Sequence, residues 1–404
     1  MYRVHVSTNG KTPTRTVLPR PRVLILMART GGGHVSLAEA LRDRLHPTMD
    51  VTIADPIAAV VRWHYRVVSR HARWVWSLEY NLTDRPALAM LAHRTNTLLS
   101  RSRLHRLLDA VRPDMIISTY PFLTWEVAQI VRERGEQTPL ILLFADPESV
   151  HQAWLSARQA WAFAPTREVQ QQAAQAGFEA SRLHLSGWPV RAQFWHAADY
   201  SRAAVCAELG LHPEHLTIFV QGGGEGAAGF ADTLNTIQAA SRDAGQPLQI
   251  ILAAGTNTAL IERYTGVAGL RVLQFTPEIA RYMAAADLVM GKAGPNTLFE
   301  SVSLGKPFLA TTYIPGQEAG NLAFIERYRL GGVALTHAAQ YQQVRALLDS
   351  PRRLAGLQAT VASYRRWNEL HAGRIPALTR EIYQCLPTRL KGVAHPSSSF
   401  TDGA

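Results

Sequence analysis

The stretch Leu288-Val-Met-Gly-Lys-Ala-Gly-Pro-Asn-Thr-Leu-Phe-Glu300 joins a short apolar run to a segment of helical character through a glycine turn. A buried strand that ends in such a turn and enters a helix is the repeating unit of an open parallel sheet, whose ligands bind where the strands end. The first backbone N–H groups of this helix can bind a diphosphate. The candidate diphosphate site is Lys292, Gly294, Pro295, Asn296 and Thr297.

Two further polar groups follow this turn. Glu300 falls in the second turn of the expected helix, where a carboxylate can accept hydrogen bonds from both hydroxyls of a ribose. Taken alone, a glutamate at this place is equally an ordinary surface residue. The loop 313–321 has a dense set of amide and carboxylate groups that suit sugar hydroxyls, and loop solvation is its alternative explanation. Its candidate ligands are Gly316, Gln317, Glu318 and Asn321.

The unit of strand, turn and helix recurs on both sides of this stretch, which predicts an α/β fold with parallel sheets and helices on both faces. A break at Ser186-Gly-Trp-Pro-Val190 separates two similar halves, and each half has its own glycine turn, at 31–33 and 222–224. The expected strands of the first half are 22–28, 114–118, 140–144 and 161–163. Those of the second half are 216–220, 248–252, 272–275, 288–290 and 307–310, with a helix from Ala227.

The chain length favours two domains, because domains usually contain about 100–200 residues. We expect a flexible extension at 1–20, a first lobe at 21–195 and a second lobe at 196–365. Residues 366–390 are expected to form a helix that packs back on the first lobe. The serine-rich residues 391–404 are expected to be disordered.

Composition narrows the possible surroundings. No run approaches the roughly 18 apolar residues that a bilayer crossing needs, and the first twenty residues lack an apolar signal core, so the protein is expected to be neither exported nor integral. Cys206 and Cys385 show no metal-ligand spacing, which fits a reducing cytoplasm without a structural metal. The net charge of +11 indicates attraction to polyanions, either nucleic acid or an anionic membrane.

A basic and aromatic segment occupies residues 60–108. If it forms one helix, Trp63, Val67, Trp74 and Leu78 lie on one stripe. The arginines that flank this stripe are Arg62, Arg66, Arg70 and Arg73. Such a helix suits a membrane interface, but packing on the first lobe with solvated arginines is equally plausible. No nucleic-acid-reading motif is present, so we expect no nucleic-acid partner.

The first glycine turn, Gly31-Gly32-Gly33, lets the backbone approach a ligand at the end of a strand, and His34 follows at the start of a helix. The helix dipole disfavours an additional positive charge there, so His34 should be neutral near pH 7 and able to accept a proton. A tight connection with a capping histidine is the competing explanation. The turn matches neither G-x-G-x-x-G nor a Walker loop.

The order of these motifs resembles the family of monogalactosyldiacylglycerol synthases and processive diacylglycerol glucosyltransferases, relatives of a family 28 glycosyltransferase. The resemblance runs from about Val23 to Gly332. Its matching pieces are Gly31-Gly-Gly-His34, Pro121-Phe-Leu-Thr124, Asp146 with His151 and Trp154, Gly187-Trp-Pro-Val190 with Phe194, Lys292-Ala-Gly-Pro295, Glu300 and Pro315-Gly-Gln-Glu-Ala-Gly-Asn321.

The resemblance implies a GT-B fold, in which two Rossmann-like lobes face each other across a cleft, and it assigns roles to residues. His34 would be the base and Asp146 a second catalytic group, while Glu300 binds ribose and Gln317 and Glu318 bind the hexose. Gly223, Gly224 and Glu225 would lie near the diphosphate and Phe275 near the uracil. The acceptor and membrane side would comprise Gly32, Gly33, Trp63, Arg66, Arg70, Trp74, Pro121, His151 and Trp154.

The sequence departs from the family pattern at Ala145, where a threonine is usual, and at Asn296, where glycine is common. The implied reaction is an inverting hexosyl transfer from UDP-galactose or UDP-glucose to diacylglycerol, by a protein peripheral on the cytoplasmic membrane face. No D-x-D motif occurs and no metal is expected, so Lys292 and helix N–H groups would stabilise the leaving UDP. Two alternatives are a polyprenyl-linked or other amphiphilic acceptor and a non-catalytic nucleotide-sugar binder.

Overall fold

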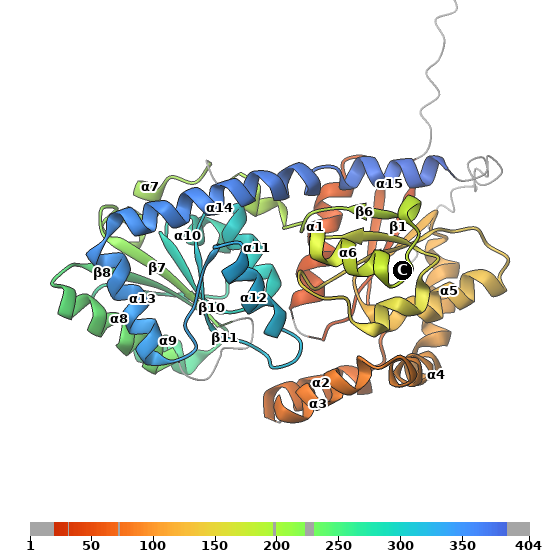
Figure 1. Ribbon diagram of the computed structural model, residues 1–404, viewed down its shortest axis with the longest axis horizontal. Helices are drawn as coiled ribbons and strands as arrows, with labels where there is room; N and C mark the ends of the chain where they lie inside the picture. The colour runs from red at the N-terminus through yellow and green to blue at the C-terminus, as the bar shows by residue number, and fades with distance from the viewer. Residues whose placement is uncertain (1–19, 31, 72, 197–198, 223–229, 386–404) are drawn as a thin grey trace, which may run out of the picture.

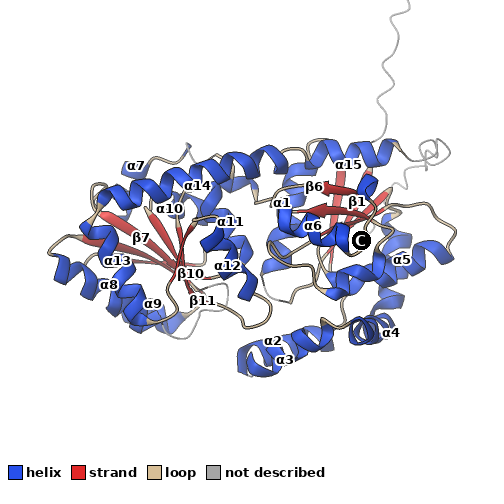
Figure 2. Cartoon of the chain, viewed as in Figure 1, coloured by secondary structure: helices blue, strands red, loops and turns tan. Residues whose placement is uncertain are grey.

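The computed structural model describes residues 20–30, 32–71, 73–196, 199–222 and 230–385. The chain forms two lobes, each built on a six-stranded parallel sheet with helices on both faces (Figures 1 and 2). The first sheet has the order β2-β1-β3-β4-β5-β6, from β1 (Arg22–Leu26), β2 (Asp50–Ala54), β3 (Met115–Ser118), β4 (Leu140–Leu143), β5 (Trp161–Ala164) and β6 (Leu183–Leu185). This arrangement confirms the predicted fold class.

The second sheet has the order β12-β11-β10-β7-β8-β9. Its strands are β7 (Leu216–Gln221), β8 (Leu248–Gly255), β9 (Leu270–Gln274), β10 (Leu288–Lys292), β11 (Phe308–Thr312) and β12 (Gly331–Val333). Central strands such as β3 and β4 are buried along their whole length because helices cover both faces, and all their residues except Ser118 are apolar.

The helices of the first lobe are α1 (Gly33–Leu45), α2 (Ala59–His71), α3 (Arg73–Thr83), α4 (Pro86–Val111), η1 (Pro121–Leu123), α5 (Thr124–Glu133), η2 (Gln152–Ala157), α6 (Arg167–Gln175), η3 (Ala180–Arg182) and η4 (Ala192–Phe194). Those that follow are α7 (Arg202–Leu209), α8 (Phe230–Ala244), α9 (Thr258–Tyr264), α10 (Ile279–Ala284), α11 (Pro295–Ser303), α12 (Ala319–Arg327), α13 (His337–Asp349), α14 (Pro351–Ala372) and α15 (Ile375–Gln384). The basic segment is therefore three helices rather than one.

Three strands were not predicted from the sequence: β2, β6 and β12. Each lies at an edge of its sheet. Their sequences, DVTIA, LHL and GGV, lack the continuous apolar run that marks a strand buried on both faces. The predicted helix start at Ala227 lies outside the described residues.

The C-terminal helices reconnect the lobes. The long helix α14 follows the second lobe, and α15 packs against α1 of the first lobe (Figure 1). The backbone N–H of Trp188 donates to Asn368 Oδ1 at 2.7 Å, and Asn368 Nδ2 donates back to the Trp188 carbonyl at 3.0 Å. A Cβ at Gly187 would lie 2.7 Å from the Asn368 carbonyl oxygen, so only glycine permits this approach. The connection between the lobes is thereby tied to α14.

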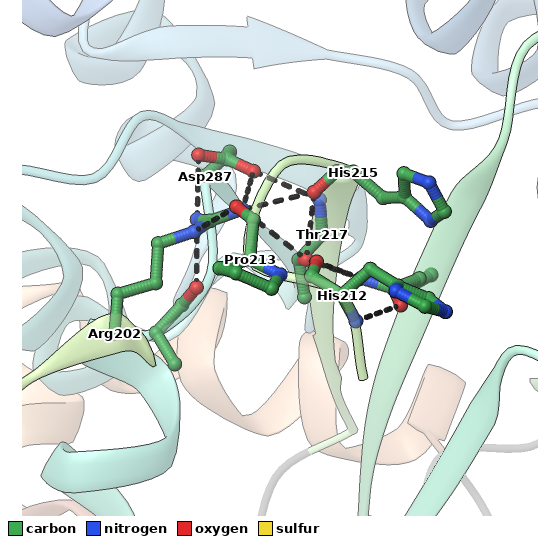
Figure 3. A network of polar contacts seen from close by, with 8 residues as sticks. Arg202, His212, Pro213, His215, Thr217 and Asp287 are labelled. Atoms are coloured by element: carbon green, nitrogen blue, oxygen red, sulfur yellow. Dashed lines mark hydrogen bonds and ion pairs between the residues drawn. The ribbon is translucent and has the colours of Figure 1, made fainter. Parts of the chain in front are cut away.

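Arg202, the first residue of α7, bonds this helix to residues at the starts of β7 and β10 (Figure 3). Its guanidinium forms a two-point ion pair with Asp287, at 2.8 and 2.9 Å, and also donates to the carbonyls of Pro213 and His215. Asp287 in turn accepts the Thr217 N–H at 2.8 Å. These contacts lie where β7 and β10 begin, at the end of the sheet away from the strand termini that bear the candidate site.

Among the helices of the described residues, none is both long and apolar enough to span a bilayer.

Candidate active site

The candidate donor site lies at the start of α11, directly after β10. Gly294 is the N-cap and has no side chain, so no side-chain cap occupies the first backbone N–H groups of α11. Both sequence features that predicted an anion site are present, namely a strand end and a helix N-terminus. Lys292 ends β10 beside this turn, and a Cβ at Gly294 would lie 3.6 Å from Lys292 Nζ.

The loop after β11 is locked against this turn. Lys292 Nζ forms an ion pair with Glu318 Oε1, and Glu318 Oε2 accepts the Ile314 N–H at 2.8 Å. Asn321 Nδ2 donates to the Ala293 carbonyl at 2.7 Å. Glu318 and Asn321 are both buried, so their hydrogen bonds hold the predicted diphosphate and hexose segments together as one unit.

Two buried amide oxygens here have no hydrogen-bond partner among the described residues: Gln317 Oε1 and Gln221 Oε1. Gln221 ends β7, and its amide nitrogen donates to Thr297 Oγ1 at 3.4 Å. Buried polar atoms without a partner are costly, and a hydroxyl-bearing ligand would satisfy them. Gln317 was predicted as a hexose ligand, whereas Gln221 was not singled out, although it directly precedes the second glycine turn.

Glu300 is almost fully buried and already paired. Its Oε1 accepts from Arg191 Nη2 at 2.9 Å and from Ser36 Oγ at 3.3 Å. Burial raises the pKa of Glu300, and the Arg191 charge and hydrogen bond act against that rise. Arg191 was not a predicted site residue, although it directly follows the Gly187–Val190 motif. Glu300, the predicted ribose ligand, and its paired cation therefore come from different lobes.

His34 is half-buried near the start of α1 in the first lobe, whereas the candidate donor residues lie in the second lobe. Its Nδ1 lies 2.6 Å from the Thr119 carbonyl oxygen, which can only accept, so Nδ1 carries the proton and Nε2 is the basic nitrogen. Burial lowers the pKa of His34 to about 4, against the opposing effect of the Thr119 bond. The ring is therefore neutral near pH 7, which agrees with the charge state expected from its place near a helix N-terminus.

Asn296 joins the two halves of the site. Its Nδ2 donates to the Gly33 carbonyl at 2.8 Å, and its Oδ1 accepts from Trp188 Nε1 at 3.2 Å. The turn before His34 is thus bonded to the first turn of α11. With both ends of its amide engaged, the Asn296 side chain serves the contact between lobes, whereas the sequence pointed to a donor contact.

Asp146 follows β4 in the first lobe. Burial raises its pKa to about 7, and the charges of Glu318 and Asp84 add to that rise. His151 is buried close by: its Nδ1 accepts the Ala153 N–H at 3.1 Å, and its Nε2 lies 3.2 Å from the Tyr80 carbonyl. These bonds make His151 a packed, neutral histidine whose pKa is lowered by burial.

The other predicted residues lie in several places, and Trp154 differs from its expected position. Trp154 is buried in the first lobe's core with its ring edge on Phe144, so it does not line the cleft. Phe275 follows the edge strand β9 and is 76% exposed. Pro121 begins η1, and Gly32 is the N-cap of α1. Gly223, Gly224 and Glu225, and the side chains of Arg66 and Arg70, lie outside the described part of the chain.

Within the described residues, no group of three or more His, Cys, Asp or Glu side chains is placed to hold an ion.

Solved structures share this architecture. A UDP-glucosyltransferase from Polygonum tinctorium superposes with a TM-score of 0.61 and 13% identity over 92% of this chain and 100% of its own. The spinosyn rhamnosyltransferase SpnG gives a TM-score of 0.58 at 14% identity, over 90% and 100%. The chain therefore has the GT-B fold.

Sequence comparison defines the family. Residues 34–190 match the monogalactosyldiacylglycerol synthase family, and residues 217–321 match the C-terminal domain of glycosyltransferase family 28. A probable monogalactosyldiacylglycerol synthase of Nicotiana tabacum is 30% identical over 76% of this chain and 61% of its own length. The Spinacia oleracea synthase is 28% identical over 81% and 67%. The chain is similar to this family along both lobes, and its matches span about two thirds or less of these relatives.

Proposed function

We propose that the protein is a hexosyltransferase that moves one hexose from a UDP-sugar to the hydroxyl of 1,2-diacylglycerol, with inversion to a β-glycoside. The observation that carries this proposal is the hydrogen bond between Asn296 Nδ2 and the Gly33 carbonyl, at 2.8 Å. It places a neutral histidine with a fixed tautomer directly across from an uncapped helix N-terminus. A base and a diphosphate site must be this close for transfer between the two substrates.

The donor would lie along the second lobe. Its diphosphate would contact the first N–H groups of α11 and Lys292, which supplies the charge that stabilises the leaving UDP. Its ribose would reach Glu300, where its hydroxyls replace or join the hydrogen bonds from Arg191 and Ser36. Its hexose would occupy the end near Gln317 and Glu318, where the unpartnered Gln317 oxygen accepts a sugar hydroxyl.

The chemical step needs one base. The acceptor hydroxyl oxygen attacks the anomeric carbon from the face opposite UDP, and the bond from that carbon to the diphosphate oxygen breaks. The electron pair leaves with UDP, and the hydroxyl proton passes to His34 Nε2. The carbonyl oxygen of Thr119 stabilises the imidazolium that forms, because it accepts a hydrogen bond from Nδ1–H. The proposed step uses no metal.

The lipid acceptor would arrive from a surface formed by α2, α3 and α4. Large apolar side chains are unusually exposed there: Trp63 by 61%, Trp74 by 74%, Leu78 by 51% and Leu98 by 84%. Residues 59–111 also contain nine arginines against three acidic residues. Exposed indoles with surrounding cations suit the interface of an anionic bilayer, where each cation near the surface contributes roughly 1 kcal/mol. This surface favours membrane docking over solvated packing.

Galactose is the preferred donor sugar of this proposal, because the relatives' names specify a galactosyl product. Glucose differs at one hydroxyl only and is therefore the comparison to run. A polyprenyl-linked acceptor is the comparison on the lipid side. The cytoplasmic face of the membrane is the proposed location.

The test is direct product formation. Purified protein is incubated with diacylglycerol in anionic vesicles and with UDP-galactose or UDP-glucose, and the lipid product is identified by mass spectrometry with the anomeric configuration by NMR. We expect a β-hexosyl diacylglycerol that is absent with the His34→Ala variant. Product from neither donor, with UDP binding intact, would contradict the assignment. Product only with a polyprenyl phosphate acceptor would replace diacylglycerol in it.

A further inference from the structure

Helix α3 touches the hexose end of the donor site, although it belongs to the other lobe. It lies beneath the loop between β11 and α12 (Figure 1). A Cβ at Gly316 would lie 3.2 Å from Tyr80 Cδ1 and 3.5 Å from both Ser77 Oγ and Asn81 Oδ1. Gly316 also has φ +84°, where a side chain would be strained. The loop therefore approaches α3 as closely as a glycine allows.

The two sides of α3 differ in character. Trp74, Leu78 and Leu82 are exposed and recur every four residues, which places them on one stripe. Ser77 and Tyr80 lie on the side that faces Gly316, and Asn81 lies between that side and the stripe. One short helix thus contacts the donor loop on one side and presents apolar surface on the other.

Polar groups gather around Gly316. Ser77 is half-buried and Asn81 is exposed, so both can reach a ligand, and the neighbouring Gln317 Oε1 is buried without a hydrogen-bond partner among the described residues. Tyr80 is next to the same place, because its Cδ1 is the nearest atom to a Cβ at Gly316, and its ring lies 4.7 Å from that of His151. Hydroxyl and amide groups around a carboxylate form the usual recognition chemistry for a sugar.

We propose that α3 completes the hexose subsite from the first lobe, with Ser77 and Asn81 as hydrogen-bonding partners of hexose hydroxyls and Tyr80 as the wall beside them. This inference rests on the proposed function and adds the source of hexose recognition. It also makes a lipid surface part of donor binding, because the stripe of Trp74, Leu78 and Leu82 is the opposite side of the same helix. Contact with an anionic bilayer would hold α3 against Gly316.

The experiment separates the hexose from the nucleotide. Binding of UDP and of a non-transferable UDP-2-fluoro-galactose is measured by calorimetry for wild type and for the double variant Ser77→Ala/Asn81→Ala. We expect the double variant to bind UDP as wild type does and the fluorosugar nucleotide about five- to tenfold more weakly, the size of one or two lost hydrogen bonds. Trp74→Ala/Leu78→Ala is the matched control, because it changes only the outer stripe.

The second arm adds anionic vesicles. Wild type should bind the fluorosugar nucleotide more tightly with vesicles than without them, and the Trp74→Ala/Leu78→Ala control should lose both vesicle flotation and this gain. UDP affinity should not respond. Equal fluorosugar affinity in wild type and the Ser77→Ala/Asn81→Ala variant would overturn the subsite, and a gain that survives in the outer-stripe control would overturn the lipid coupling. Failure of wild type to bind UDP at all would instead contradict the proposed function.

Discussion

Replacing Asp146 by asparagine tests the electrostatics of the cleft. Asp146 is a partly buried carboxyl whose pKa is raised to about 7, first by burial and then by the charges of Glu318 and Asp84. Its carboxyl in the unfolded chain ionises near its ordinary value of about 3.9. Between these two values the folded protein holds a proton that the unfolded chain has released. Ionised Asp146 therefore works against folding above pH 7.

The sign follows from proton linkage. Because the folded state binds more protons across this range, the Asp146 contribution to the free energy of unfolding falls as pH rises from about 4 to about 7. Three pKa units correspond to about 4 kcal/mol, which is a ceiling because water reaches part of the side chain. We expect roughly half of it. Asparagine is neutral at every pH, so Asp146→Asn should match wild type near pH 4 and be about 2 kcal/mol more stable at pH 8.

The measurement is the difference between variant and wild type in urea unfolding, at several pH values from 4 to 8. Subtracting wild type from variant cancels the pH-dependent contributions of other groups to the free energy of unfolding. One of these groups is His34, whose lowered pKa makes stability rise with pH between about 4 and 6.5. Asp232→Asn, which removes an exposed carboxyl on α8, is the control for the loss of a surface carboxylate. If the difference in free energy of unfolding between variant and wild type does not change with pH, the pKa of Asp146 is not raised by burial.

Three further predictions concern the reaction. His34→Ala should retain UDP binding by calorimetry and lose about 10²–10⁴-fold in turnover, and near-normal turnover would remove His34 from the chemistry. Asn296→Ala loses the hydrogen bonds to Gly33 and Trp188, so kcat should fall about tenfold while the KM for the donor stays close to that of wild type. A large rise in the donor KM with unchanged kcat would instead make Asn296 a donor ligand. Arg191→Ala removes the cation that lowers the pKa of Glu300, so UDP binding should weaken below neutral pH more steeply than in wild type; parallel pH profiles would show that Glu300 stays ionised without Arg191.

The central fold could be predicted because buried parallel strands are long apolar runs. Every strand flanked on both sides, from β1 and β3 to β10 and β11, was predicted close to its observed position. The missed strands β2, β6 and β12 are edge strands, which need only one hydrogen-bonded neighbour and tolerate polar residues or glycines. For the basic segment, periodicity alone did not indicate that 60–108 belongs to three helices.

The candidate site divides in the same way. Features confined to a short stretch, such as the uncapped start of α11, follow from a strand end and a helix N-terminus and were predicted. His34 is neutral as expected, but burial rather than the helix dipole lowers its pKa. Contacts between lobes join residues far apart in the chain, such as Gly33 with Asn296, and no local pattern encodes them. Trp154 was predicted to line the acceptor side of the cleft, but its side chain packs in the core of the first lobe against Phe144.

Arg191 shows what the contacts between lobes add to the site. Glu300 alone, buried as it is, would tend to take up a proton and lose the charge that attracts ribose hydroxyls. Arg191 opposes that change from the segment that connects the lobes, and Ser36 adds a hydrogen bond from α1. Because Ser36 lies two residues after His34, the helix that carries His34 also contacts Glu300. In the proposed mechanism, donor binding at Glu300 is thereby coupled to the placement of His34, and the two lobes form one active site only when they are in contact.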